Sequence, residues 1–227
     1  MDFLDALTTF FFPANCLHCE ERLPKAELFL CPGCSSALPW LEASSRCPRC
    51  FLESCSCSTF TGPLSRRLAV FSHFGPAFSL VQHFKFAGRE EMASVMASLM
   101  LVQLEKAGMP WPDYIVPVPH APWHALLRGY HPTDLIARAL AKRMHVKVAK
   151  VLKRHWTSLP QHSKTKGQRI LTPQPMFSLR GASLMADRTI LLIDDVTTTG
   201  ETLQQCSRVL QQSFPSSIYA CTLTLVE

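Results

Sequence analysis

The sequence lacks any apolar run of the roughly 20 residues that a membrane-spanning helix needs. Its first segment, MDFLDALTTFFFPA, is apolar but has neither a basic residue nor a small-residue cleavage site. We therefore expect no secretory signal peptide and a cytoplasmic location. Hydrophobic residues make up 47% of the 227 residues, which excludes a disordered chain and is enough to bury a sizeable core.

Acidic residues are absent from a long stretch in the second half of the chain. Residues 135–186 hold eleven Lys or Arg and no Asp or Glu, whereas the net charge of the whole chain is only +6. The rest of the chain therefore has a net charge of −5. A basic stretch of this length attracts anions, either a polyphosphate ligand or a nucleic-acid backbone. The alternative is a solvated basic surface without a partner.

Strand-like and helix-like segments alternate after about residue 60, which predicts a mainly parallel, doubly wound α/β sheet. We predict two domains, a small Cys-rich one over 1–60 and the α/β domain over 61–227. Residues 155–180 show no periodicity and predict a long mobile loop. The expected strands are 68–73, 113–118, 146–151, 188–193 and 216–226, and the expected helices are 3–11, 76–86, 90–106, 131–144 and 200–213. The apolar stripe of helix 90–106 is Met92, Val95, Met96, Leu99 and Val102.

The strand expected at 188–193 runs directly into two acids, Asp194 and Asp195, called here the acid pair. Parallel strands point their carboxyl ends at the ligand crevice. Two adjacent carboxylates there must face water, metal or hydroxyl groups. Each could accept a hydrogen bond from a ribose hydroxyl, with Mg²⁺ nearby binding the same diol and a pyrophosphate.

A Thr-rich segment follows the acid pair and leads into a helix. It offers hydroxyls and backbone N–H groups, and a helix N-terminus favours a phosphate dianion. We call it the phosphate loop; its expected ligand-binding residues are Thr197, Thr198, Thr199, Gly200, Glu201 and Thr202. An ordinary capped strand–turn–helix would explain the Thr and Gly residues but not the two acids.

Eight of the ten cysteines lie between residues 16 and 57. Two C-x₂-C pairs separated by eleven residues have the spacing of a zinc ribbon, which predicts a structural Zn²⁺ with four protein ligands. The first cysteine cluster is Cys16, Cys19, Cys31 and Cys34.

A second group has one C-x₂-C pair followed after four residues by C-x-C, and it predicts a second Zn²⁺ site whose spacing is less regular. Redox chemistry is the alternative, but neither pair starts a helix within a βαβ unit. This second cysteine cluster is Cys47, Cys50, Cys55 and Cys57. Cys206 and Cys221 lie outside both clusters and are expected in the core.

The segment TILLIDDVTTTGETL resembles the signature of type I phosphoribosyltransferases, which implies their fold and a phosphoribosyl pyrophosphate site. In the 6-oxopurine transferases an Asp that is their proposed general base stands where this chain has Thr198. Its absence argues against purine salvage of that type.

With the N-terminal cysteine ribbon, nearly the whole chain resembles the ComF family of competence-associated proteins. Other segments that carry the resemblance are HFKFAGR at 83–89, IVPVP at 115–119, RGY at 128–130, and Gln161 with Arg169 eight residues later. The chain departs from the family pattern at His131, Pro132, Lys164 and Thr172.

The resemblance implies a role in handling incoming single-stranded DNA during natural transformation, with a DNA-uptake helicase and processing proteins as partners. The expected site combines the acid pair, these family landmarks and the residues that a transferase would need around the pyrophosphate. The expected catalytic residues are Asp194, Asp195, Lys85 and Arg128, and further ligand contacts are expected from Pro119, His120, Gln161 and Arg169.

Three functions remain open. The first is a Mg²⁺-dependent transferase that displaces pyrophosphate from C1 of phosphoribosyl pyrophosphate. The second is a non-catalytic module that binds single-stranded DNA through the basic stretch and senses a nucleotide. The third, a pyrimidine-operon type of regulator with the same fold, is disfavoured by the cysteine ribbon.

Overall fold

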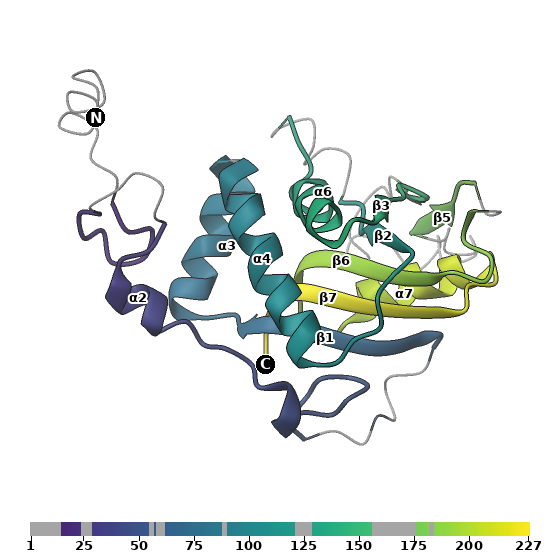
Figure 1. Cartoon of the computed structure of the whole chain (residues 1–227), viewed down its shortest axis with the longest axis horizontal. Helices are drawn as coiled ribbons and strands as arrows, with labels where there is room; N and C mark the ends of the chain where they lie inside the picture. Colours follow the sequence, from purple (N-terminus) through teal and green to yellow (C-terminus); the bar gives the residue numbers. More distant parts are fainter. Residues whose placement is uncertain are drawn as a thin grey trace, which may run out of the picture.

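The computed structural model of the chain describes residues 15–23, 29–54, 57, 62–87, 90–120, 129–155, 176–181 and 184–227. Its centre is a five-stranded sheet in which every neighbouring pair of strands is parallel (Figure 1). A short antiparallel pair lies beside it. The sheet order is β1 (Leu64–Ser72), β7 (Ser217–Leu225), β6 (Thr189–Thr197), β2 (Tyr114–Pro117) and β3 (Lys147–Val148), and the pair is β4 (Leu152–Arg154) with β5 (Phe177–Leu179).

Helices cover both faces of the sheet. Figure 1 shows α3, α4 and α6 on one face and α7 on the other. Their bounds are α3 (Gly75–Ala87), α4 (Glu90–Lys106), α6 (Pro132–Met144) and α7 (Glu201–Gln211). The alternation of strands and helices predicted from the sequence is therefore confirmed.

The middle strand, β6, is buried on both faces because its apolar side chains alternate between two cores. Leu191 and Ile193 belong to the core beneath α4 and α6, whereas Ile190 and Leu192 belong to the core beneath α7. Such a run is typical of a central parallel strand. The strand that carries the acid pair is thus packed between both cores of the sheet.

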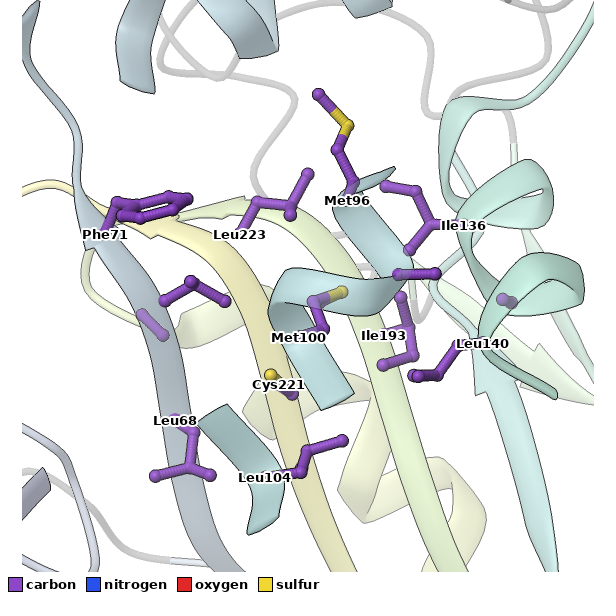
Figure 2. Packing of buried hydrophobic residues seen from close by; sticks show 14 of the residues in the cluster. Leu68, Phe71, Met96, Met100, Leu104, Ile136, Leu140, Ile193, Cys221 and Leu223 are labelled. Atoms are coloured by element: carbon purple, nitrogen blue, oxygen red, sulfur yellow. The ribbon is translucent and has the colours of Figure 1, made fainter. Parts of the chain in front are cut away.

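The stripe predicted for α4 is only partly correct. Met92 and Met96 are buried, but 42% of Val95 and 40% of Val102 is exposed. Met96, Met100 and Leu104 instead belong to the same core cluster as residues of α6 and the sheet, and Figure 2 shows Met100 and Leu104 over the strands. The helix packs against two partners at once, so its buried face is rotated from the stripe read off the sequence.

Three strand predictions are corrected in their bounds. β1 begins at Leu64, four residues before the predicted start. The strand predicted over 146–151 is reduced to Lys147–Val148. β6 continues through the acid pair to Thr197, because β7 keeps pairing with it up to Leu225. The loop predicted over 155–180 contains β5, although residues 156–175 and the helix predicted over 3–11 lie outside the described residues.

The segment that follows the first cysteine cluster packs onto the sheet. Helix α2 (Pro32–Ser36) carries Cys34, the last residue of that cluster, and the segment after it contains the single turn η1 (Ala43–Ser45). Leu41 and Phe51 are buried in the main core, and the Leu41 N–H donates to the Val70 carbonyl oxygen at 3.0 Å. The domain boundary near residue 60 stays a prediction. Within the described residues no helix is long and apolar enough to cross a membrane.

Candidate functional site

The acid pair lies at the carboxyl edge of the sheet, where β6 extends beyond its neighbour β2. The last register pair of β2 and β6 joins Pro117 to Ile193, so both acids lie just past it. Asp194 and Asp195 are only 5% and 3% exposed. Buried carboxyl groups require partners, and the partners come from two other elements.

Lys85, in the last turn of α3, lies with its Nζ 3.3 Å from Asp195 Oδ2. His120, three residues after β2, has its Nε2 3.9 Å from Asp194 Oδ1. The Asp195 N–H donates to Asp194 Oδ1 at 2.9 Å. The structure therefore brings together four residues that the sequence analysis named separately.

The surroundings of the acid pair disfavour ionisation of Asp194. Burial raises the pKa of Asp194 well above its usual range, and the neighbouring Asp195 charge raises it further. Burial also lowers the pKa of His120, against the attraction of Asp195. Asp195 lies beside Lys85, and the two adjacent carboxyl groups together could form hydrogen bonds with the two hydroxyls of a diol.

Tyr130 holds the end of α3 in place. Its hydroxyl lies 3.1 Å from the Phe84 carbonyl oxygen and 2.8 Å from the Lys85 carbonyl oxygen, and donates to them. Two sequence motifs that lie 45 residues apart, HFKFAGR and RGY, are thereby joined beside the acid pair. Arg128, predicted as catalytic, lies outside the described residues, as do Gln161 and Arg169.

The phosphate loop turns sharply from β6 into α7. Thr198 and Thr199 are exposed, and the Thr199 hydroxyl oxygen accepts a hydrogen bond from the Glu201 N–H at 3.3 Å. The Thr197 hydroxyl is buried and makes no hydrogen bond to any residue that the structure describes. Gly200 is the N-cap of α7 with φ of 82°, a left-handed conformation that glycine adopts without strain. The exposed Thr198 and Thr199 thus lie at the N-terminus of α7, the end of a helix that favours an anion.

Sequence reasoning missed His73, which follows the last residue of β1 at the same edge of the sheet. Its Nδ1 lies 2.8 Å from the Thr224 hydroxyl, and burial together with the Lys85 charge lowers its pKa. The sequence analysis counted His73 as the end of a strand. Its place at the carboxyl end of a parallel strand was the available signal.

His120 and the acid pair form a group that could hold a divalent cation, because their ligand atoms all lie within 4.8 Å of one another. Carboxylate oxygens are the ligands that Mg²⁺ prefers. The two carboxyl groups of this donor set therefore fit Mg²⁺.

The four thiols of the first cysteine cluster also lie within 4.8 Å of one another. The Sγ atoms of Cys19 and Cys31 are 3.7 Å apart, close to the separation of about 3.8 Å between ligands of a tetrahedral Zn²⁺ with 2.3 Å bonds. Burial opposes ionisation of Cys16, but backbone hydrogen bonds outweigh it and lower its pKa to about 6. Burial and the neighbouring thiols raise the pKa of Cys34. Four thiolates this close together would repel one another unless a cation lay between them. Their number and spacing fit a zinc ion.

The second cysteine cluster brings together Cys47, Cys50 and Cys57, whose sulfur atoms also lie within 4.8 Å of one another. Cys57 Sγ is 3.2 Å from Cys47 Sγ and 4.0 Å from Cys50 Sγ. The predicted fourth ligand, Cys55, lies outside the described residues. Cys206 and Cys221 are buried in the core as predicted.

Comparison with known proteins agrees with this arrangement. A family model described as a phosphoribosyl transferase domain matches residues 128–225, which include the acid pair and the phosphate loop. Together with the parallel sheet and its helices, this match confirms the phosphoribosyltransferase fold predicted from the sequence.

Three relatives match most of the chain. Competence protein F of Haemophilus influenzae is 26% identical over 215 residues, which cover 89% of this chain and 93% of that protein. DNA utilization protein YhgH of Escherichia coli O157:H7 is 26% identical over 204 residues, or 87% and 85%. Competence protein ComFC of Streptococcus pneumoniae is 25% identical over 199 residues, or 87% and 81%.

Proposed function

Because the chain belongs to the ComF family, we propose that it binds phosphoribosyl pyrophosphate or a related ribose 5-phosphate at the carboxyl edge of the sheet. We propose further that it acts in the cytoplasm in the handling of single-stranded DNA during natural transformation, with a DNA-uptake helicase and processing proteins as partners. The names of the relatives, which refer to competence and DNA utilization, support the second part.

The observation that carries the ligand proposal is the buried acid pair beside Lys85 and the exposed phosphate loop. The ribose 2′- and 3′-hydroxyls would lie against Asp194 and Asp195, and the 5′-phosphate would accept hydrogen bonds from Thr198, Thr199 and the N–H groups that begin α7. Hydroxyl groups are neutral, so they can approach the two carboxyl groups without adding charge. A bound ribose would explain why two acids lie at this strand end, which an ordinary strand–turn–helix would not.

The remaining polar groups at this edge would bind the pyrophosphate. Lys85 would attract its negative charge, and His120, with Arg128 and Pro119, would line the same side. Mg²⁺, held by carboxylate oxygens of the acid pair and by the ligand, would neutralise part of the pyrophosphate charge. This use of the residues applies both to a transferase and to a protein that only binds the ligand.

In a transferase, the C1–O bond to pyrophosphate would break with both electrons leaving on the oxygen, while an acceptor donates a pair to C1. The positive charge that develops on the sugar ring would lie near the negative acid pair. Catalysis would then come mainly from positioning and electrostatic stabilisation.

Calorimetry with phosphoribosyl pyrophosphate and Mg²⁺ tests the ligand proposal. We expect saturable binding that Asp195→Asn weakens at least about tenfold, since hydrogen bonds to charged groups contribute about 1.5–3 kcal/mol each. Asp187→Asn is a matched control, because Asp187 is exposed and its φ of 57° suits Asn. Equal binding by both variants would refute the proposed site.

A screen of acceptors for pyrophosphate release then separates enzyme from sensor. Release with any acceptor that is lost in Asp195→Asn establishes a transferase. If the ligand binds tightly and no acceptor releases pyrophosphate, the site serves as a sensor.

The basic stretch favours a second candidate function, non-catalytic binding of single-stranded DNA. Some of its cations already have partners within the protein. Lys150 pairs with Asp134, and the Arg143 guanidinium donates to the hydroxyls of Ser94 and Ser98 at 2.7 and 2.9 Å. The three basic residues Lys164, Lys166 and Arg169 lie outside the described residues and are the cations to test.

Fluorescence anisotropy with a labelled oligonucleotide tests this candidate. Binding without sequence preference should weaken steeply with salt, and the triple substitution of Lys164, Lys166 and Arg169 by Ala should weaken it further at low salt. Unchanged affinity of the triple variant would show that this segment is not the contact surface.

A further inference from the structure

Arg67 forms a contact that the site described so far does not use. It belongs to β1, and only 2% of its surface is exposed. Its Nε and Nη2 both donate to the Cys50 carbonyl oxygen, at 2.9 and 2.6 Å. On its other side the guanidinium lies against Gly200, where an added Cβ would be 2.2 Å from Nη1. The guanidinium therefore fills the space between the second cysteine cluster and the phosphate loop.

Cys50 connects the second cysteine cluster to Arg67 through two different groups. Its thiol lies in the second cysteine cluster, 4.0 Å from Cys57 Sγ, while its carbonyl oxygen accepts the two hydrogen bonds from Arg67. The preceding residue is also tied to β1, because the Arg67 N–H donates to the Arg49 carbonyl oxygen at 2.9 Å. A metal ion that fixes the Cys50 thiol would therefore fix the backbone that holds the guanidinium.

The charge of Arg67 also acts on the phosphate loop. Gly200 is the N-cap of α7, and a helix N-terminus carries a partial positive charge. A guanidinium keeps its charge in proteins, so a second positive charge is buried directly against that helix end. Both charges attract an anion bound at the loop, and the anion in turn offsets their mutual repulsion.

We propose that Arg67 is a positioning residue through which the second cysteine cluster controls the phosphate loop. The metal-bound cluster holds the Cys50 carbonyl oxygen, this oxygen holds the guanidinium, and the guanidinium holds Gly200 in its left-handed conformation and adds positive potential at the 5′-phosphate. Metal binding at the cluster and phosphate binding at the loop are then coupled. The coupling is reciprocal, so each strengthens the other by the same factor. This inference rests on the proposed ribose 5-phosphate site.

Arg67→Met tests the inference by removing the charge and the forked donors while keeping an unbranched side chain. With Mg²⁺ present, calorimetry should show at least about tenfold weaker binding of ribose 5-phosphate. Arg66→Met is the matched control on the same strand. The Arg66 guanidinium donates to the carbonyl oxygens of Pro48 and Ala107, at 3.2 and 3.1 Å, and this variant should bind within about twofold of the unchanged protein.

Two readouts without catalysis separate positioning from a general loss of stability. Amide hydrogen exchange at residues 198–202 should become faster in Arg67→Met without ligand, while the amides of β6 exchange as before. Ribose 5-phosphate should slow the transfer of zinc to a chromophoric chelator, and Arg67→Met should abolish this effect. Unchanged exchange and unchanged zinc transfer in Arg67→Met would overturn the inference.

Two further variants keep the test decisive if Arg67→Met does not fold. Arg67→Lys keeps the charge without the forked donors and should bind ribose 5-phosphate with intermediate affinity. Gly200→Ala pushes a Cβ into the guanidinium, and combining it with Arg67→Lys should weaken binding less than the two separate effects predict. Additive effects would overturn the coupling. If the unchanged protein binds no ribose 5-phosphate, the proposed function fails, while the exchange measurement still decides the role of Arg67.

Discussion

The first cysteine cluster and the acid pair both hold groups of the same charge type close together, but the surrounding protein supports them differently. The thiols of Cys16 and Cys31 share a small core with Leu23 and a few partly buried neighbours. The acid pair lies in β6, which pairs with β7 along its whole length. We therefore expect the first cysteine cluster to depend on a bound metal, whereas the acid pair is held in place by the sheet.

From this difference we expect a structural site at the cluster and a ligand site at the acid pair. A cluster whose apolar core is so small should need a metal to fold, because the binding free energy of the metal becomes folding free energy. A carboxylate pair on a strand buried on both faces is held in an unfavourable arrangement by the rest of the fold. Such residues are where proteins bind ligands at the expense of stability.

The largest expected effect comes from removing the metal of the first cysteine cluster. Structural zinc contributes on the order of 10 kcal/mol, so Cys16→Ser should unfold the ribbon while the α/β domain stays folded. Metal analysis of protein purified without chelator should find at least one zinc per chain. Hydrogen exchange should show which segments lose protection.

Cys206→Ala is the control for this prediction. Cys206 is a buried thiol outside both clusters, so its replacement should lower stability modestly and leave the zinc content unchanged. A protein without zinc, or a Cys16→Ser variant with an intact ribbon, would show that the first cysteine cluster does not need a metal to fold.

Double substitution of the acid pair by Asn should have the opposite pattern. The two carboxyl groups repel each other, so the variant should melt at the same temperature as the unchanged protein or slightly higher. Binding of the phosphoribosyl ligand should nevertheless weaken by at least about tenfold. Thermal melting and calorimetry on the same preparations provide both values. Loss of folding without a ligand defect would make the acid pair structural.

The pH dependence of stability sharpens the comparison further. The folded-state pKa of Asp194 is raised, so its contribution to stability is fully present below the unfolded pKa and is lost as pH rises through the folded pKa. Each unit of the raised pKa corresponds to about 1.4 kcal/mol. Asp194→Asn removes this loss, and its advantage in melting temperature should grow from pH 5 to pH 8 without added Mg²⁺. An advantage that stays constant with pH would contradict this assignment.

The sequence analysis recovered the features that depend on local pattern. The alternation of strands and helices and the position of the acid pair at a strand's carboxyl end follow from periodicity and residue type. Lys85 was named through family resemblance and His120 through the transferase hypothesis, and the structure places both beside the acid pair. Local sequence pattern was sufficient for features that are set by residues close together in the sequence.

The features that could not be predicted from the sequence depend on contacts between distant segments. The buried face of α4 is set by α6 and the sheet together, so Met100 and Leu104 replace the predicted Val95 and Val102. The sequence analysis assigned no role to Arg67, and its burial between Cys50 and Gly200 is seen only in the structure. No periodicity within one segment carries this information.

The smallest expected effect concerns Thr199, which belongs to the phosphate loop that follows the acid pair. Its hydroxyl oxygen accepts a hydrogen bond from the Glu201 N–H at 3.3 Å, and we propose that its O–H donates to the 5′-phosphate. Thr199→Val keeps the branched shape and removes both bonds. Affinity for ribose 5-phosphate should fall a few-fold, up to about tenfold, in line with a hydrogen bond of about 0.5–1.5 kcal/mol. Thr199→Ser restores the hydroxyl and should recover the affinity, and the zinc content should not change in either variant. If Thr199→Val bound ribose 5-phosphate as tightly as Thr199→Ser, this hydroxyl would not contact the phosphate, and backbone N–H groups alone would account for binding at the loop.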